Sequence, residues 1–226
     1  LLPVPGYRQR LHAAQDNVLS DAKCAKFFGM LAASSRPLIY AGGGVINGDA
    51  TDELRRMAEH FGIPVTTTLM GIGAVDTTER LSLHMLGMHG LASANYAVED
   101  CDFLIAVGAR FDDRVAGVPE RFAPKARSIA QFDIDPSEIG KVKAVDWSHV
   151  GVLKQDLQAM LDYAVKHRIA PDFSDWHDEI ADLKRTYRLN FDRDSELIQP
   201  YAVIETINSI TGGDAVISTG VGQHQM

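Results

Sequence analysis

The residue types best suited to bind an anion stand close together directly after an apolar run. Arg110, Asp112, Asp113 and Arg114 follow residues 103–107, whose sequence is FLIAV. Such a run is typical of a strand buried in a parallel sheet, and ligands bind at the carboxyl edge of these sheets. Guanidinium groups are fork-shaped donors that suit phosphate. A surface cluster of ion pairs is the alternative, but the position after a strand favours ligand contact.

Three consecutive glycines occupy an equivalent position after another apolar run. Gly42, Gly43 and Gly44 follow residues 37–41 and precede a helical pattern. Without a Cβ, backbone N–H groups can approach a pyrophosphate closely. The dinucleotide fingerprint G-x-G-x-x-G is not met, because Asn47 stands where its last glycine is required. A tight turn with positive φ would also explain the glycines, which alone leave cofactor binding open.

An acidic pair closes a third predicted strand. Asp133 and Asp135 end the segment 128–134 and stand before Pro136. An acidic residue at such a strand end can accept hydrogen bonds from ribose hydroxyls. A turn before the proline accounts for Asp135, so we assign the ligand role to Asp133 alone.

The sequence shows no pattern typical of a metal site or of nucleophilic catalysis. His84 and His89 lie in a second glycine-rich stretch, but their spacing does not match a helical metal pair, and we predict no metal site. No Ser-His-Asp or Cys-His arrangement follows from spacing. The residues therefore predict a nucleotide-type crevice without a catalytic acid, base or nucleophile.

Alternating apolar runs and amphipathic segments predict the elements that position these residues. Strands are expected at 37–41, 63–67, 103–107, 128–134 and 150–153, and helices at 20–34, 49–61, 91–98 and 157–165. Ser20 and Asp49 are expected to cap the first two helices, and Gly62 to end the second. The pattern is typical of an α/β, doubly wound, mainly parallel sheet covered on both faces.

The domain organisation is expected to comprise four parts. They are a linker over 1–19, a central α/β domain over 20–167, a linker helix on the surface over 168–198, and the truncated start of another domain over 199–226. The last part has a helical stripe formed by Tyr201, Ile204, Ile207 and Ile210, then a predicted strand at 215–218. Because the chain starts without Met and stops just after that strand, we expect a piece of a longer protein.

Composition narrows the function further. The formal charge is −8, from 22 Lys+Arg against 30 Asp+Glu, and no basic block stands out, which disfavours nucleic-acid and anionic-membrane partners. No apolar run approaches the ~20 residues needed to span a bilayer. Two cysteines fit a reducing compartment. With no transit segment in view, we expect a cytoplasmic bacterial protein.

Several strings together are more specific than any single motif. They are RPLIYAGGGV, IPVTTTLMGIGAVD, LHMLGMHGLASANYAVEDCDFLIAVGARFDDRVAG, FAPKA, FDIDPSEIGKVK and TGVGQHQM. In this order they resemble the catalytic subunits of acetolactate synthase (acetohydroxyacid synthase), nearly end to end, with residues 166–199 least distinctive. The resemblance implies a Rossmann-like six-stranded sheet in the central, FAD-binding domain, followed by the start of the C-terminal thiamine-diphosphate domain.

The resemblance also implies a reaction. Acetolactate synthases are transferases that condense pyruvate with a second 2-ketoacid, pyruvate or 2-ketobutyrate, in branched-chain amino-acid biosynthesis. Thiamine diphosphate, held with magnesium, supplies the carbanion chemistry, and the FAD does no net redox work. The family implies a homodimer or homotetramer with a small regulatory subunit.

Carried over residue by residue, the resemblance implies three sets of site residues. FAD would contact Gly42, Gly43, Thr68, Leu69, Met70, His89, Gly108, Ala109, Arg110, Asp112, Arg114, Val115, Asp133, Ile134 and, as a weaker match, Asp156. Thiamine diphosphate would contact Val221, Gly222, Gln223 and His224. Met88, Asp113 and Arg114 would border the substrate and inhibitor channel.

The same resemblance implies that the active site is incomplete here. The family's catalytic Glu belongs to a preceding domain, and its magnesium ligands would follow Met226. We therefore expect no catalytic residue and no metal ligand within these residues, and no activity from the chain alone. Two alternatives stay open: a related thiamine-diphosphate carboligase or decarboxylase without FAD, and a stand-alone nucleotide-binding module.

Overall fold

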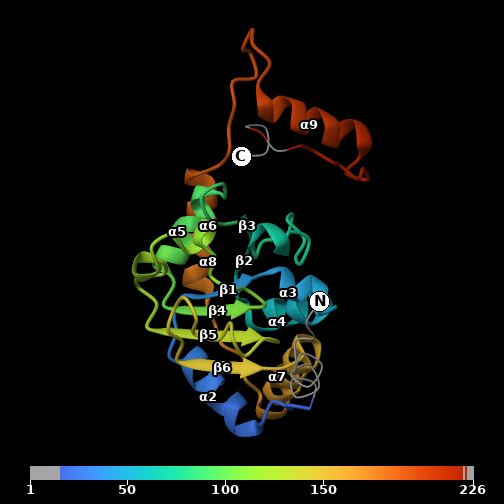
Figure 1. The fold of residues 1–226 in the computed structure, drawn as a ribbon. Helices are drawn as coiled ribbons and strands as arrows, with labels where there is room; N and C mark the ends of the chain where they lie inside the picture. Colours follow the sequence, from blue (N-terminus) through green and yellow to red (C-terminus); the bar gives the residue numbers. More distant parts are fainter. Residues whose placement is uncertain (1–15, 221, 223–226) are drawn as a thin grey trace, which may run out of the picture. The chain divides into compact units, whose positions relative to one another are not determined.

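A computed structural model describes residues 16–220 and residue 222. The chain divides after Tyr187 into two units, and each is considered by itself (Figure 1). The first unit contains the sheet and most of the helices, and the second contains one helix, α9 (Pro200–Thr211).

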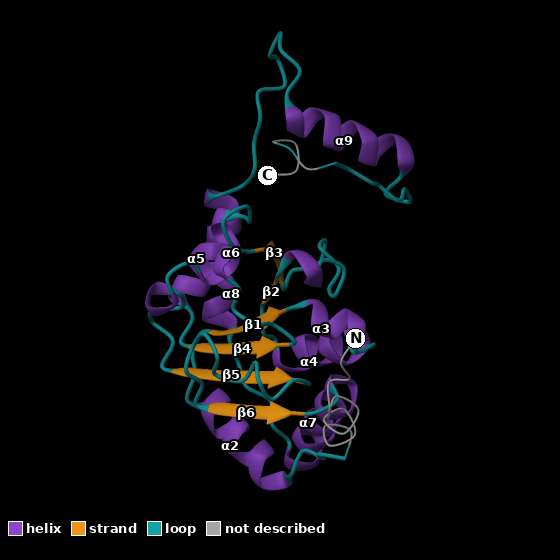
Figure 2. Ribbon diagram, viewed as in Figure 1, coloured by secondary structure: helices purple, strands orange, loops and turns teal. Residues whose placement is uncertain are grey.

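A six-stranded sheet forms the centre of the first unit. Its strands are β1 (Pro37–Ala41), β2 (Val65–Thr67), β3 (Ser82–Met85), β4 (Phe103–Val107), β5 (Ser128–Asp133) and β6 (Trp147–Val150). They are ordered β3-β2-β1-β4-β5-β6, and every pairing is parallel. The prediction of a doubly wound α/β fold is confirmed (Figure 2).

The two central strands explain why their sequences are continuous apolar runs. All five residues of β1 and all five of β4 are buried. A parallel sheet is covered on both faces, so neither side of such a strand can be polar.

The helices and short 3-10 turns complete the layers. They are α2 (Asp21–Ala32), α3 (Gly43–Asn47), α4 (Thr51–Phe61), η1 (Leu69–Gly71), α5 (Ala92–Asp100), α6 (Asp113–Ala116), η2 (Pro119–Arg121), α7 (Leu153–His167) and α8 (Ser174–Thr186). On one face, Phe27 of α2 packs edge-on against Phe132 and Trp147 of the sheet. Its neighbour Phe28 joins α4 and α7 through Phe61 and Tyr163. This aromatic cluster fastens three helices to the sheet.

Two of the three predicted helix ends are confirmed. Ser20 caps α2, where its hydroxyl accepts the Lys23 N–H at 3.4 Å. Gly62 ends α4 with φ of 65°, a conformation that glycine adopts at little cost. The expectation for Asp49 is wrong, because Ala50 is the N-cap of α4 and the Asp49 carboxylate pairs with Lys154 at 2.5 Å.

Both edge strands depart from the expected positions. The strand expected at 150–153 lies instead at β6, and α7 already begins at Leu153. β3 was not predicted at all. Edge strands here are short and mix polar with apolar residues, in the sequences WSHV and SLHM, so they lack the apolar runs that mark central strands.

Helix α8 is more than a linker on the surface. Trp176 and Ile180 are buried, and the Trp176 indole N–H donates to the Pro37 carbonyl at the start of β1, at 2.9 Å. Arg36 pairs with Glu179 on the next turn at 2.7 Å. The first unit therefore continues through α8 to Tyr187, whereas the helical stripe alone suggested a separate connection.

In the second unit, the helix is confirmed and the strand is wrong. α9 carries Tyr201, Ile204, Ile207 and Ile210 as expected, and all four are exposed. Residues 215–218 are exposed and form no strand. A strand needs a neighbour for its backbone groups, and the described residues of this unit offer none.

Within residues 16–220 and 222, no helix is long and apolar enough to cross a membrane.

The burial of Trp176 yields a test of the α8 packing. Trp176→Ala should lower the free energy of unfolding by about 3–5 kcal/mol, because a large buried side chain and its hydrogen bond are lost. Val165→Ala, on the exposed side of α7, is the control and should change it by no more than about 0.5 kcal/mol. Urea unfolding measures both, and equal small effects would show that α8 lies loosely on the surface.

Candidate functional site

The carboxyl ends of the six parallel strands lie along one edge of the sheet, which we call the ligand edge. The order of the strands reverses between β1 and β4. β1 leads to β2 and β3 on one side, and β4 leads to β5 and β6 on the other. Such a switch point is where doubly wound folds bind nucleotides. Gly42 follows β1 and Gly108 follows β4, so both lie at this point.

The turns after β1 and β4 are in direct contact. A Cβ on Gly42 would lie 2.2 Å from the Gly108 carbonyl oxygen, and one on Gly44 would lie 2.7 Å from the Gly108 Cα. Gly108 itself has φ of 57°, but none of Gly42, Gly43 and Gly44 has positive φ. The interpretation as a positive-φ turn is therefore wrong: Gly42 and Gly44 are needed because two backbones pass closely.

Gly43 faces a different neighbour. A Cβ there would come within 2.9 Å of the Met70 Cβ, in the turn after β2. Thr68 caps this turn, because its hydroxyl accepts the Gly71 N–H at 3.1 Å. Gly43 and Gly44 are both only partly buried, and Gly43 is the one of the two whose neighbour is Met70 and not the Gly108 backbone.

Large apolar side chains are exposed along the same edge. Leu69, Met70 and Met88 follow β2 and β3 and are 59%, 70% and 68% exposed, and Ile134 after β5 is 44% exposed. His89, beside Met88, is also exposed. Such side chains in a row are a typical feature of a binding surface.

The two arginines lie between these apolar groups, in the turn after β4. Phe111 is buried against Tyr40 and Phe122, with ring centroids 5.5 Å and 5.9 Å away. This anchor leaves the flanking Arg110 and Asp112 exposed, and they form an ion pair at 3.0 Å. Ala109 and Val115, by contrast, pack into the core or against it.

Arg114 and Asp113 begin the short helix α6. Both are exposed, and the Arg114 carbonyl accepts the Met88 N–H at 3.1 Å. The turns after β3 and β4 thus meet, which brings the three predicted channel residues together. Asn95 fixes the β3 side, since its amide exchanges two hydrogen bonds with Gly87, at 2.8 and 3.0 Å. Sequence reasoning missed Asn95, which stands inside an ordinary helix pattern.

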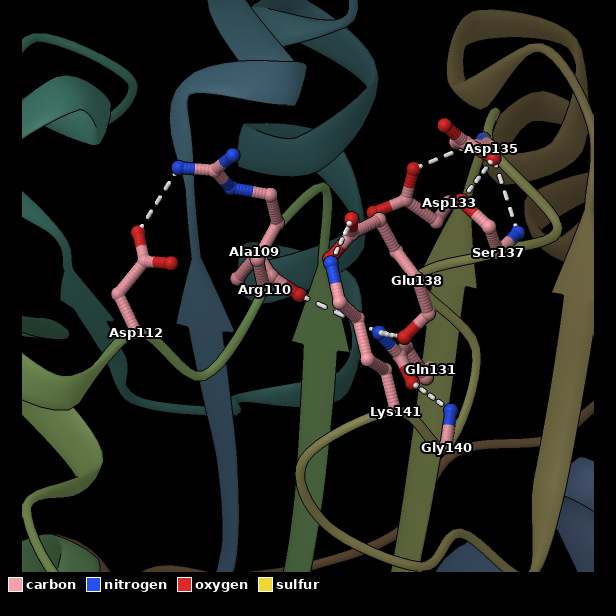
Figure 3. A network of polar contacts seen from close by, with 10 residues as sticks. All are labelled: Ala109, Arg110, Asp112, Gln131, Asp133, Asp135, Ser137, Glu138, Gly140 and Lys141. Atoms are coloured by element: carbon pink, nitrogen blue, oxygen red, sulfur yellow. Dashed lines mark hydrogen bonds and ion pairs between the residues drawn. The ribbon is translucent and has the colours of Figure 1, made fainter.

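Asp133 ends β5 on the other side of the arginines. Its carboxylate accepts the Asp135 N–H at 2.9 Å, and the Asp135 carboxylate in turn binds Ser137 (Figure 3). Burial raises the pKa of the Asp133 carboxyl above its ordinary value, with a contribution from the charge of Glu138. A desolvated carboxylate is suited to accept hydrogen bonds from ligand hydroxyls.

A cavity of about 250 Å³ lies beside these turns. It is lined by Arg110, Asp112 and Asp113 from one turn, and by Glu138 and Lys141 from the loop after β5. Both signs of charge therefore meet in it.

Asp156 lies in the first turn of α7, beside Gly151, the residue that directly follows β6. Asp156 is buried within α7, and its Oδ1 lies 3.0 Å from the His149 Nε2, also buried. Its Oδ2 has no hydrogen-bond partner in the described part of the chain. The residues that directly follow β6 are Gly151 and Val152.

The predicted thiamine-diphosphate loop belongs to the second unit. Val221, Gln223 and His224 lie outside the described residues, and Gly222 is partly buried. That prediction stays a prediction.

Comparison with known proteins gives a consistent result. The family model described as thiamine pyrophosphate enzyme, central domain, matches residues 24–160. The acetolactate synthase large subunit of Parasynechococcus marenigrum (strain WH8102) is 45% identical over 206 residues, which is 91% of this chain and 33% of that protein. The chloroplastic acetolactate synthase of Arabidopsis thaliana is 43% identical over 226 residues, covering 99% of this chain and 32% of that protein.

Acetolactate synthase 1 of Zea mays is also 43% identical, over all of this chain and 34% of that protein. The chain thus spans about a third of the length of these curated relatives. The matched family model covers β1 to β6, which are the strands of the doubly wound sheet. The chain therefore belongs to the central-domain family of thiamine pyrophosphate enzymes.

Proposed function

We propose that this protein is the catalytic subunit of an acetolactate synthase, and that the first unit is its FAD-binding central domain. The identity of 43–45% to acetolactate synthases over nearly the whole chain supports this assignment. The protein would condense pyruvate with pyruvate or 2-ketobutyrate. On this proposal residues 199–226 begin the thiamine-diphosphate domain, and the magnesium ligands and catalytic Glu belong to other parts of the protein.

The order of chemical groups along the ligand edge is the observation that carries the FAD proposal. Exposed apolar side chains follow β2 and β3, two exposed guanidinium groups follow β4, and a desolvated carboxylate with an exposed Ile134 follows β5. FAD has the same order of parts: an apolar ring system, a pyrophosphate, then a ribose and a second ring. The residues present fit the cofactor.

Each part of the edge would make one kind of contact. Leu69, Met70 and Met88 would pack against the flavin ring, and Arg110 and Arg114 would donate to the pyrophosphate. Asp133 would accept from the ribose hydroxyls. The rest of the proposed FAD contacts are Gly42, Gly43, Thr68, His89, Gly108, Ala109, Asp112, Val115 and Ile134, with Asp156 the least supported because it is buried in a pair with His149.

When bound, FAD would supply no net oxidation or reduction, and thiamine diphosphate would supply the carbanion chemistry. The role of this chain is then positioning. Met88, Asp113 and Arg114 would border the path of the 2-ketoacid, where the positive charge of Arg114 suits the substrate carboxylate. Val221, Gly222, Gln223 and His224 would hold the diphosphate of thiamine diphosphate.

Arg114 provides the test of the proposed function. The purified intact protein should show flavin absorbance and form acetolactate when thiamine diphosphate and magnesium are supplied. Arg114→Ala should weaken binding of FAD or 2-ketoacid about 10- to 100-fold, because a charged hydrogen bond is worth about 1.5–3 kcal/mol. Arg185→Ala, which removes an exposed arginine of α8, is the control.

Three results bear on the alternatives. Activity without flavin would favour a related carboligase or decarboxylase. Flavin binding without any ketoacid turnover by the intact protein would favour a nucleotide-binding module. Unchanged kinetics and flavin affinity in Arg114→Ala would show that this arginine is a surface residue that contacts neither FAD nor the 2-ketoacid.

Variants of Gly42 and Gly43 distinguish a glycine that is needed for backbone packing from one that contacts the ligand. Gly42→Ala should lower the thermal unfolding midpoint strongly, since its Cβ would clash with the Gly108 backbone. Gly43→Ala would place its Cβ 2.9 Å from the Met70 Cβ and 3.3 Å from the Met70 carbonyl oxygen, a milder clash than that of Gly42, so it should cost less stability and weaken FAD binding more. Thermal unfolding of the FAD-free protein and flavin fluorescence titration measure the two effects. Parallel losses of stability and affinity in both variants would contradict a ligand role for Gly43.

The Asp133 carboxylate is expected to lower the stability of the folded protein and to contribute to FAD binding. Because burial raises its pKa in the folded state, the folded protein loses stability as the pH rises from the ordinary pKa to the raised pKa, and the loss is complete above the raised pKa. Asp133→Asn keeps an acceptor for the Asp135 N–H and removes the charge. The variant should therefore gain stability relative to the wild type at pH 7, and this gain should fade as the pH falls through the raised pKa toward the ordinary value.

FAD affinity of Asp133→Asn should fall at the same time, if the carboxylate accepts ribose hydroxyls. Urea unfolding between pH 3 and pH 7 measures the first effect and flavin titration the second. A variant that is less stable at pH 7 and binds FAD normally would contradict both statements.

A further inference from the structure

Gln131 is a buried polar side chain that none of the motifs or proposed ligand contacts includes. It lies on β5, two residues before Asp133, and is fully buried. Because side chains alternate along a strand, Gln131 and Asp133 lie on the same face of the sheet. A buried amide lowers stability unless its donors and acceptor are all paired, so its partners indicate its role.

The Gln131 amide bonds to two different loops (Figure 3). Its Nε2 donates to the carbonyl oxygens of Ala109, at 3.4 Å, and Glu138, at 3.1 Å. Its Oε1 accepts the Gly140 N–H at 3.0 Å. The opposite amide orientation would set Oε1 against two carbonyl oxygens, so these partners fix the orientation shown.

Both loops carry residues of the proposed FAD site. Ala109 directly precedes Arg110, whose side chain is exposed on the ligand edge. The other loop starts from Asp133 and Ile134 and is held at its beginning by the bond from the Asp135 N–H to Asp133. Gln131 holds the same loop again near its middle, at residues 138–140, so the first half of the loop is fixed at two points.

The same two loops line the cavity of about 250 Å³, one through Arg110 and the other through Glu138. Lys141 pairs with Glu138 at 2.7 Å on the loop side, and Asp112 pairs with Arg110 at 3.0 Å on the other. Each of these two ion pairs therefore lies within one loop, and neither crosses from one loop to the other. Gln131 provides hydrogen bonds that connect them.

The Gln131 amide does more than fill space, because an apolar side chain would leave its backbone partners without these hydrogen bonds. An apolar side chain of similar length would fill the same volume, and all three partners of Gln131 are backbone atoms of loops. The amide fixes the separation between the loop that presents Arg110 and the loop that begins at Asp133 and Ile134.

We propose that Gln131 is a positioning residue that sets the separation of these two loops and thereby the affinity for the pyrophosphate and adenosine part of FAD. This inference rests on the proposed function for the identity of the ligand. Gln131 itself would not touch FAD, since it is covered by the loops it binds.

The test compares two variants of the intact protein that each remove a buried hydrogen bond from a side chain to backbone. Gln131→Met preserves the size of the side chain and removes all three bonds. Trp176→Phe removes the bond to the Pro37 carbonyl, at the amino end of β1 and away from the ligand edge. FAD affinity is read by flavin fluorescence, stability by thermal unfolding of the FAD-free protein, and loop order by hydrogen exchange of residues 109–114 and 134–141.

Both variants should unfold at lower temperature, but only Gln131→Met should bind FAD about tenfold or more weakly and exchange faster in the two loops. Tenfold corresponds to about 1.4 kcal/mol, the upper range for one neutral hydrogen bond. If Gln131→Met does not fold, Gln131→Asn replaces it, because a shorter amide cannot reach both loops and should show the same selective losses.

Two outcomes would overturn the proposal. One is FAD affinity within twofold of the wild type despite a lowered unfolding temperature, and the other is unchanged exchange in both loops. A wild-type protein that binds no FAD would refute the proposed function and the affinity part of this inference. Faster loop exchange in Gln131→Met would still support the positioning role.

Discussion

The contact between the turns after β1 and β4 is the constraint on which the ligand edge depends. The Gly42 N–H donates to the Val107 carbonyl and the Gly108 N–H to the Phe132 carbonyl, both at 2.9 Å. These bonds continue the sheet pairing beyond the strand ends, across β1, β4 and β5. No side chain fits between Gly42 and Gly108, so the positions of Gly43 on one side and Arg110 on the other are fixed relative to each other.

The exposed polar groups of the edge are held in place by buried neighbours. Phe111, packed against Tyr40 and Phe122, adopts φ of 58°, a conformation that costs a non-glycine residue about 1–3 kcal/mol. The burial of its ring offsets that strain and presents Arg110 and Asp112 to solvent. Gln131 and Asn95 act in the same way through hydrogen bonds, one under the β5 loop and the other under the β3 loop. Rigid support beneath exposed groups is what a preorganised binding site requires.

The sequence predicts the central fold well because central strands of a parallel sheet must be apolar on both faces. The runs at β1, β4 and β5, and the turns that follow them, lie where the pattern places them. The edge strands were misplaced or missed since a strand with one neighbour tolerates residues such as Ser148 and His149. Gln131 and Asn95 could not be identified, because a buried amide leaves no periodic signal and its partners are distant backbone atoms. Asp156 illustrates the converse, since a carboxylate in a plausible place is buried against His149.

On the proposed function, a flavin without a redox role would stabilise the fold by covering the exposed apolar side chains of the ligand edge. Leu69, Met70 and Met88 are more than half exposed, although each belongs to a turn directly above the core. Covering apolar surface contributes roughly 25 cal/mol per Å², so a flavin ring on these residues would act as a missing part of the core. A ligand that binds only the folded state stabilises it in proportion to the logarithm of its concentration over its dissociation constant. On the proposed function, FAD affinity and the stability of this edge are therefore two measures of the same interactions.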